Sequence, residues 1–190
     1  MSKVQENILT RRTIFRFNDK VVSNDCIETA IEAARHAPCH KNTHPWKFYI
    51  LGDESREKLI PIVETLAKVK ATSEDNKRLD SLLDRARNKI LKPPVLIAIT
   101  SLINKEDSFR EQEDYAATVC ALHNMVLSFW DQGIGTQWST GSITRDKGTY
   151  SALSIPIERE RIIGFVKAGF PENIPNKEKK PIDGIRFYLP

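Results

Sequence analysis

The sequence predicts one domain in which α-helices and β-strands are mixed, and three patterns indicate this. Apolar residues recur at helical spacing in residues 24–37 and, over a longer stretch, in residues 108–132. Residues 46–51 alternate in the manner of a strand with one buried face. Residues 95–100 are apolar on both faces, as expected of a central strand. A chain of 190 residues has the length of a single domain, so residues 1–190 are treated as one unit.

The N-terminal part of the chain is expected to hold a short helix and an extended segment. The helix is expected between a capping Ser2 and the pair Arg11-Arg12. Three of its apolar side chains are expected to face the core: Val4, Ile8 and Leu9. Residues 13–17 then look extended.

The middle of the chain begins with a second helix, which is expected to start near Ser23 and to stop before Pro38. Proline disfavours helical geometry in the residue before it. A third helical region contains Pro61, and the sequence leaves open whether a helix starts or kinks there. The polar residues 71–80 are predicted to form a mobile lid, and the helix after them is expected to end at the two prolines 93–94.

The C-terminal part contains the longest helix, residues 108–132, which is apolar on most sides. We expect such a helix to lie in the core and also to contact a partner subunit. Residues 133–141 follow as a glycine-punctuated loop, residues 146–153 as a short helix and residues 161–170 as another strand. The tail, residues 171–190, contains four prolines and is expected to wrap over something else, such as a partner subunit.

The composition is that of a globular protein, with 40% hydrophobic and 28% charged residues. The net charge of +4 is spread along the chain, which argues against nucleic acid as a partner. Three cysteines are too few for a disulfide framework and fit a reducing compartment. The N-terminus lacks the apolar core of a signal peptide, and the longest apolar run, residues 95–99, is too short to cross a bilayer. We therefore expect a cytoplasmic protein that does not act at a membrane.

Residues 36–51 concentrate chemically versatile side chains, with three of the four histidines and one of the three cysteines. The run lies where a helix gives way to a strand, a place where binding sites often occur. Four of its side chains could in principle hold a metal ion: His36, Cys39, His40 and His44. Pro38 spoils their alignment on one helix face, so we expect no metal site. Cys39 as a nucleophile has no carboxylate near it in sequence to orient a histidine.

Two further segments could bind a ligand. Arg11, Arg12 and Thr13 place two guanidinium groups and a hydroxyl at a helix end. This suits phosphate, because a guanidinium donates paired hydrogen bonds, although a solvated basic pair is the alternative. Residues 133–141 lack the lysine and the spacing of a P-loop. Their glycines suit either close backbone approach to a flat ligand or a helix cap and a turn.

Four motifs in sequence order resemble the FMN-dependent nitroreductase family. Residues 11–13, RRT, resemble its N-terminal Arg-Arg-Ser, and residues 37–46, APCHKNTHPW, resemble its Ala-Pro-Ser-x-x-Asn-x-Gln-Pro-Trp segment. Residues 133–141, GIGTQWSTG, resemble its Gly-Leu-Gly-x-x-Trp-x-x-Gly loop, and residues 163–171, IGFVKAGFP, resemble the glycine-rich strand that follows. The resemblance spans nearly the whole chain.

The resemblance implies an α+β fold in which helices surround a mostly antiparallel sheet. It also implies an intertwined homodimer with FMN at the interface and with residues 171–190 crossing to the partner subunit. The implied activity is that of an oxidoreductase. NADH or NADPH would pass a hydride to flavin N5, and a nitroaromatic, quinone or similar acceptor would then be reduced at the same site by a ping-pong mechanism. Two alternatives stay open: a flavin-binding protein for storage or redox sensing, and a metal-dependent enzyme that uses the histidines and Cys39.

The cofactor-binding residues implied by the resemblance fall in three groups and one tail position. The first group would hold the FMN phosphate, ribityl chain and pyrimidine edge: Arg11, Arg12 and Thr13. The second would approach the same flavin from the other subunit: His36, His40 and Asn42. The third would lie along the isoalloxazine ring: Gln137, Trp138 and Ser139. Lys180, or its neighbour Lys179, would add positive charge near the phosphate.

No side chain is assigned as catalytic, because protons can come from water. Many members of the family carry a lysine shortly after Arg-Arg-Ser that stabilises the reduced flavin. Here Ile14 and Phe15 occupy that region. The candidates for the missing charge are Arg16 or a histidine of residues 36–40.

Overall fold

The computed structural model describes residues 1–71 and 79–190. Its helices are α1 (Lys3–Thr10), α2 (Asn24–Arg35), α3 (Asp53–Glu57), α4 (Ile60–Lys70), α5 (Leu79–Leu91), α6 (Ser108–Asp131) and α7 (Lys147–Ala152). Its strands are β1 (Trp46–Ile50), β2 (Val95–Leu102), β3 (Gly135–Ser139) and β4 (Glu160–Gly169). Short 3-10 turns are η1 (His40–Asn42), η3 (Ser142–Thr144) and η4 (Ile182–Gly184). Most of the predicted lid of residues 71–80 lies outside the described residues.

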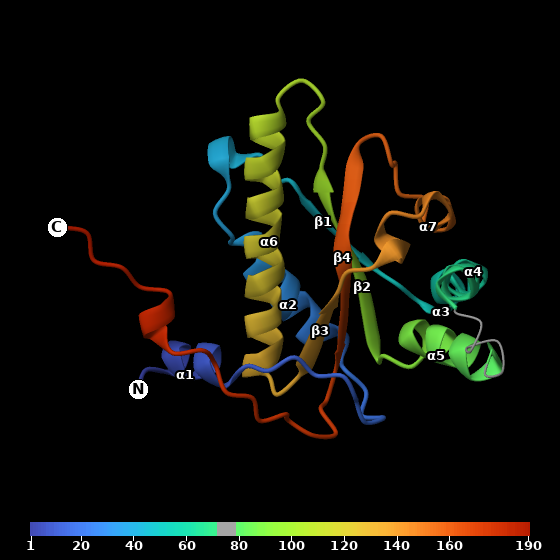
Figure 1. Cartoon of the computed structure of the whole chain (residues 1–190), viewed down its shortest axis with the longest axis horizontal. Coiled ribbons are helices and arrows are strands. Elements are labelled where there is room, and N and C mark those ends of the chain that lie inside the picture. The colour runs from blue at the N-terminus through green and yellow to red at the C-terminus, as the bar shows by residue number, and fades with distance from the viewer. Residues whose placement is uncertain (72–78) are drawn as a thin grey trace.

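The four strands form one sheet in the order β1-β2-β4-β3, and each neighbouring pair is antiparallel. Helices α2 and α6 cover one face of this sheet, and α3, α4, α5 and α7 lie on the other side (Figure 1). Strand β4 bulges near Ile163, where its register with β2 shifts. The architecture confirms the α+β fold with an antiparallel sheet.

Each face of the sheet has its own apolar core. On the face under α2 and α6, Ile97 and Val166 are fully buried with residues of both helices. On the opposite face, Leu96 and Phe165 pack with residues of α5, α7 and the start of α4. Strand β2 is therefore buried on both sides, as its sequence predicts.

Local signals in the sequence explain where several helices begin and end. The hydroxyl of Ser2 accepts a hydrogen bond from the Gln5 amide at 3.3 Å and caps α1. Helix α4 begins at Ile60, so Pro61 lies in the first turn, where its missing N–H leaves no bond unmade. Helix α6 ends at Gly133, whose φ is +73°, with bonds from Gly133 and Ile134 back to the last turn in a Schellman pattern.

The orientation predicted for α1 is wrong. Val4, Ile8 and Leu9 are exposed in the single chain, with 69%, 47% and 52% of their surface accessible. The helix instead turns a polar side toward α6. Asn7 donates to the carbonyl of Leu127 at 2.9 Å, and Trp130 Nε1 donates to the Thr10 hydroxyl at 3.0 Å. The apolar side of α1 is left without a partner in this chain.

The loop predicted for residues 133–141 is also wrong in its central part. Residues 135–139 form β3, which pairs with β4 along the edge of the sheet. A side chain at Gly135 would overlap Ile14, so the glycine lets the extended residues 13–14 lie against the strand. The glycine at position 135 is therefore required by the close packing of two extended segments and does not mark a loop.

Two further apolar surfaces, besides that of α1, are exposed in the described part of the single chain. One is a stripe along α6, and its exposed members include Phe109, Tyr115, Ala116, Cys120 and His123. The other is the tail, which leaves the body of the molecule and ends far from the sheet (Figure 1). Its exposed apolar residues are Ile174, Ile182, Ile185, Phe187, Tyr188 and Leu189. Apolar surface of this extent is typical of a contact with another chain.

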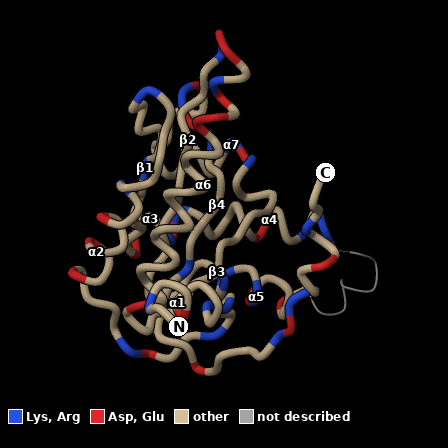
Figure 2. Tube along the Cα trace, turned by 90° about the vertical axis from the view of Figure 1, so that its left-hand side faces the viewer, with Lys and Arg blue, Asp and Glu red and all other residues tan. Residues whose placement is uncertain are grey.

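Charged residues are distributed widely. Basic and acidic residues are interspersed along the trace (Figure 2). No helix in the described part of the chain is both long enough and apolar enough to span a membrane.

Candidate functional site

Two of the predicted groups of site residues lie side by side in one chain. The amide of Ile14 donates to the carbonyl of Thr136 at 2.9 Å, and Thr13 forms a parallel bridge with Thr136. Residues 11–13 therefore run along the outer edge of β3. This edge brings the two arginines next to the strand that carries Gln137, Trp138 and Ser139.

The arginines form a cationic pair at the end of α1. Arg12 donates from Nη1 to the carbonyl of Leu9 at 2.7 Å and to that of Arg11 at 3.0 Å, so part of its guanidinium caps the helix. Burial, and then the charge of Arg12, lowers the pKa of Arg11. Neither guanidinium has an acidic partner among the described residues. Two adjacent cations without a carboxylate suit an anionic ligand.

Strand β3 presents an indole at the surface two residues beyond its bridge to Thr13. Trp138 Nε1 donates to the carbonyl of Ile163 at 3.3 Å, and the ring lies over Gly164, where a side chain would overlap it. The Trp138 side chain remains 40% exposed, and Gln137 and Ser139 are partly buried. The strand thus offers a flat aromatic surface and polar side chains at one edge.

The third predicted group lies around the C-terminus of α2 and in η1. His40 Nδ1 is 2.8 Å from a carboxylate oxygen of Glu113, and Arg110 donates to the His40 carbonyl at 2.7 Å. His36 Nε2 is 3.0 Å from Glu32 Oε1. Asn42 is exposed and has a positive φ of 53°.

Backbone strain marks the same segment. Lys41, Asn42 and His44 all have positive φ, which is uncommon for residues other than glycine. Such strain often occurs where a loop is shaped for binding. The strain therefore supports a functional role for residues 36–46, independently of their side chains.

Turn η1, which carries His40 and Asn42, lies at the opposite end of α6 from the arginine pair. His36 instead lines a groove beside α1, together with Asn7 and Leu127. Turn η1 contacts the helix at Arg110 and Glu113, whereas α1 contacts it at Leu127 and Trp130. The 14 residues from Glu113 to Leu127 span about 21 Å of helix. A single chain therefore does not gather all of the predicted residues around one ligand. Lys180 lies in the exposed tail.

The histidine and cysteine side chains of residues 36–44 do not converge. His36 and His40 face different glutamates, His44 lies edge-on to Trp46, and Cys39 packs against the apolar core. No cluster of three or more possible ligands that could hold a metal ion occurs within residues 1–71 and 79–190.

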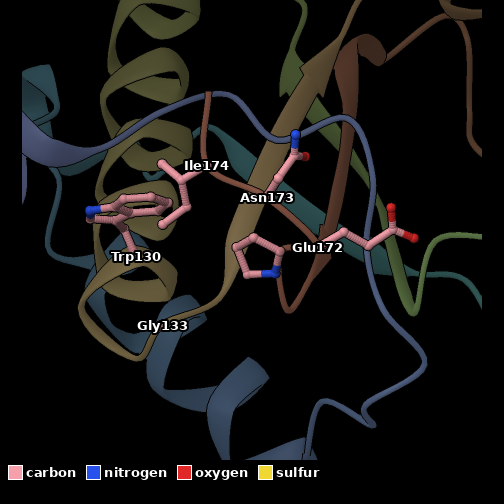
Figure 3. A pocket seen from close by; sticks show the side chains of 6 residues that line it. Trp130, Gly133, Glu172, Asn173 and Ile174 are labelled. Carbon is pink, nitrogen blue, oxygen red and sulfur yellow. The ribbon is translucent and has the colours of Figure 1, made fainter. Parts of the chain in front are cut away.

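The tail forms a second feature near α1. Residues 171–174 cross the C-terminal end of α6 and, with Trp130 and Gly133, line a groove of about 580 Å³. Figure 3 shows Ile174 pointing at the indole of Trp130, while Glu172 points away. The tail therefore leaves the body of the protein close to Thr10, the partner of Trp130, and so close to the arginine pair.

Lys167 is a candidate functional residue that the sequence motifs did not indicate. Lys167 lies on the central strand β4 with only 6% of its surface exposed, and it lines a cavity of about 290 Å³. The cavity lies between α4, α5 and the segment that follows β3. Burial, and then the charge of Lys89, lowers the pKa of Lys167 to about 8. The available signal was a lysine inside the apolar run of residues 162–170.

Comparisons with known proteins bear on the family and the fold of this chain. The model of the nitroreductase family matches residues 8–170. YfhC of Bacillus subtilis (strain 168), which carries the name of an NAD(P)H nitroreductase, is 26% identical over 187 residues, which is 98% of this chain and 93% of that protein.

Two solved structures have the same fold. A nitroreductase-like protein from Bacillus cereus superposes with a TM-score of 0.82 at 26% identity, over 100% of this chain and 97% of its own. A protein from Desulfovibrio desulfuricans, described as a nitroreductase and crystallised with FMN, has a TM-score of 0.75 at 22% identity, over 100% of this chain and 98% of its own. Because the family model covers most of the chain, the protein belongs to the nitroreductase family.

Proposed function

We propose that this protein is an FMN-dependent NAD(P)H oxidoreductase that works as a homodimer. The observation that carries the proposal is the placement of two unpartnered arginines along the edge strand that bears Trp138. The family membership and the name of the Bacillus subtilis relative support an NAD(P)H-dependent oxidoreductase. The FMN complex of the Desulfovibrio desulfuricans protein supports FMN as the cofactor.

The residues fit a flavin mononucleotide in its separate parts. Arg11 and Arg12 would hold the phosphate, which matches their lack of an acidic partner. Thr13 would donate its exposed hydroxyl to the polar part of the cofactor. Residues 137–139 would lie along the ring system. When bound, the cofactor supplies the hydride chemistry, and the protein supplies binding and orientation.

A second copy of the chain would complete the site. The exposed stripe on α6 and the exposed apolar tail are the surfaces that a dimer would cover. Pairing of two α6 helices in opposite directions would bring η1 of one chain toward the arginine pair of the other. His36, His40 and Asn42 would then contact the cofactor across the interface. Lys180 would reach the phosphate only from a tail that has crossed to the partner.

The residues around this site imply a simple division of roles. The reduced nicotinamide and the electron acceptor, a nitroaromatic or a quinone, would use the same open face in turn, which gives ping-pong kinetics. Trp138 would form one wall of that face. No side chain is needed as an acid, since water can supply the protons. Release of the oxidised nicotinamide would precede binding of the acceptor.

The visible absorption spectrum of the purified protein tests the proposal directly. We expect an oxidised flavin spectrum that bleaches on anaerobic addition of NADH or NADPH, and the faster donor identifies the preferred nucleotide. A flavin that neither donor bleaches would favour the storage or sensing role. Protein that stays colourless after incubation with FMN would refute the proposal.

The oligomeric state tests the shared site separately. Light scattering is expected to give twice the chain mass of 21.7 kDa. A monomer that retains stoichiometric FMN would show that one chain suffices, and would leave residues 36–42 without a role in binding.

A further inference from the structure

The cavity beside Lys167 combines apolar walls with a rim of mainly polar residues. Its walls are largely apolar and include Leu66 of α4, Ile90 of α5 and Phe165 of β4. Its rim includes Ser139 and the residues that follow it up to Ile143. A cavity of this kind excludes much of the water that would otherwise screen a charge.

The charged groups that line the cavity are all basic within the described residues. Lys167 projects from β4, Lys89 from α5 and Lys70 from α4. Lys167 forms neither an ion pair nor a side-chain hydrogen bond within residues 1–71 and 79–190, although it is more than nine-tenths buried. Its cross-strand neighbours, Leu96 and Gln137, bring no carboxylate. Because most of the Lys167 side chain is removed from water and no carboxylate of the described residues offsets its charge, an anion in the cavity would be favoured.

Backbone amides at the rim of the cavity could also donate hydrogen bonds to an anion. The amides of Thr140 and Gly141 have no acceptor within the described part of the chain. Both follow directly on Ser139, the last residue of β3. Residues 140 and 141 and Lys167 line the same cavity, at the end of that strand.

The other cations considered for the reduced cofactor are less suitable. Arg16 is exposed on the far side of the extended residues 13–17, and its carbonyl accepts from Glu172. His36 and His40 are already engaged by Glu32 and Glu113. A charge in water is screened and a charge with a partner is offset, so neither acts strongly on a ligand.

We infer that Lys167 is the cation that stabilises the negative charge of the reduced flavin in this protein. The inference rests on the proposed function, because the cavity shares Ser139 with the strand assigned to the ring system. Lys167 thereby takes the role of the lysine that Ile14 and Phe15 replace in the N-terminal motif. Lys89, at the exposed rim, adds a smaller contribution.

The inference predicts a change in redox potential. A cation that favours the reduced form binds it more tightly than the oxidised form and raises the midpoint potential. For a two-electron couple, each tenfold change in this ratio of affinities shifts the potential by about 30 mV. Lys167→Met keeps the length of the side chain and removes the charge. In this variant we expect the ratio of affinities for reduced and oxidised flavin to decrease at least tenfold. The midpoint potential at pH 7 should therefore fall by at least about 30 mV.

Arg16→Met is the matched control, because it removes the rival cation from an exposed position. Its midpoint potential is expected to equal that of the wild type. Dissociation constants for oxidised FMN, measured by fluorescence, accompany each potential and separate weaker binding from altered preference. A shift with Arg16→Met and none with Lys167→Met would overturn the inference.

A pH series gives a second readout, in which the wild-type protein is compared with the polar variant Lys167→Gln. Loss of the Lys167 charge on raising the pH should make the potential fall more steeply with pH than in Lys167→Gln. Equal slopes would overturn the assignment of Lys167 while leaving the oxidoreductase intact. Wild-type protein that binds no FMN would overturn the proposed function, and this inference with it.

Discussion

Strand β4 buries an ionisable side chain near each of its ends, and the two surroundings are opposite in kind. Glu160 is 1% exposed and accepts hydrogen bonds from Lys47 at 2.5 Å, Thr100 at 2.7 Å and Tyr49 at 2.8 Å. Lys167 is 6% exposed and has no partner among the described residues. A buried charge that is fully bonded belongs to the fold, whereas one without a partner indicates a ligand that has still to bind.

The same contrast separates the two ends of α6. At its start, Arg110, Glu113 and Asp114 bond with one another and with η1. At its end, Arg11 and Arg12 form no ion pair with a carboxylate of the described residues. Removing a partnered charge should therefore cost stability, and removing an unpartnered one should cost binding.

The largest effect is expected at the partnered end of β4. Glu160→Ala leaves two buried hydroxyls and Lys47 without their acceptor, and should lower the free energy of unfolding by about 3 kcal/mol. Urea denaturation of the apoprotein measures this. The control is Glu158→Ala, whose pair with Lys105 is solvent-exposed and is expected to contribute little to stability. Equal losses in both variants would remove the distinction between partnered and surface charges.

The next effect is expected in binding at the arginine pair. Replacing both Arg11 and Arg12 with Ala should raise the dissociation constant for FMN by about a hundredfold, since each charge-assisted hydrogen bond contributes roughly 1.5–3 kcal/mol. Fluorescence titration measures it, and urea denaturation should show a nearly unchanged fold. Lys92→Ala, at an exposed position just after α5, is expected to change the constant by less than about threefold. Full flavin content in the double variant would refute the phosphate assignment.

Replacement of Lys167, at the other end of β4, should increase the stability of the apoprotein, whereas replacement of Glu160 should decrease it. Burial, followed by the charge of Lys89, lowers the pKa of Lys167 to about 8, so the folded state is penalised while the lysine is charged. Lys167→Met should therefore stabilise the apoprotein by about 2 kcal/mol at pH 7. The wild type recovers this difference as the pH rises from about 8 toward 10.5, where the unfolded chain also loses its proton. Urea denaturation at pH 7 and pH 10 checks the sign, and a destabilised variant would contradict it.

The smallest effect is expected in the pKa of Tyr49, which tests the hydrogen bond between Tyr49 and Glu160. Burial, and then the hydrogen bond to Glu160, raises the pKa of Tyr49 to about 12. In Glu160→Gln the second cause weakens and the first remains, so this pKa should fall but stay above 10. Absorbance of the phenolate at 295 nm, taken as the difference from a Tyr49→Phe variant, follows the group alone. An unchanged pKa would show that burial accounts for all of the shift.

Much of the fold follows from the sequence, and the failures have a common cause. The caps at Ser2 and Ser23, the stop before Pro38 and the two-sided strand β2 are confirmed. The inward orientation of α1 and the loop at residues 133–141 are wrong. In both failures a local pattern was overridden by what the segment packs against, which the sequence does not state.

The candidate site divides in the same way. The motifs named the arginine pair and residues 137–139, and the structure brings these together along one edge. The motifs also named residues 36–42, of which His40 and Asn42 lie at the other end of α6 in the single chain, while His36 lies beside α1. The motifs did not indicate Lys167, because the burial and the partners of a single lysine in a strand cannot be inferred from the residues next to it.

The sequence by itself determined the elements, their caps and the family, since these depend on side chains within a few residues of one another. Only the tertiary structure decided which charges are satisfied. Glu160 and Lys167 lie seven positions apart on one strand, and nothing local distinguishes their fates. Glu160 meets partners from β1 and β2, while Lys167 meets a cavity between helices, because the sheet register and the helix packing place those groups there.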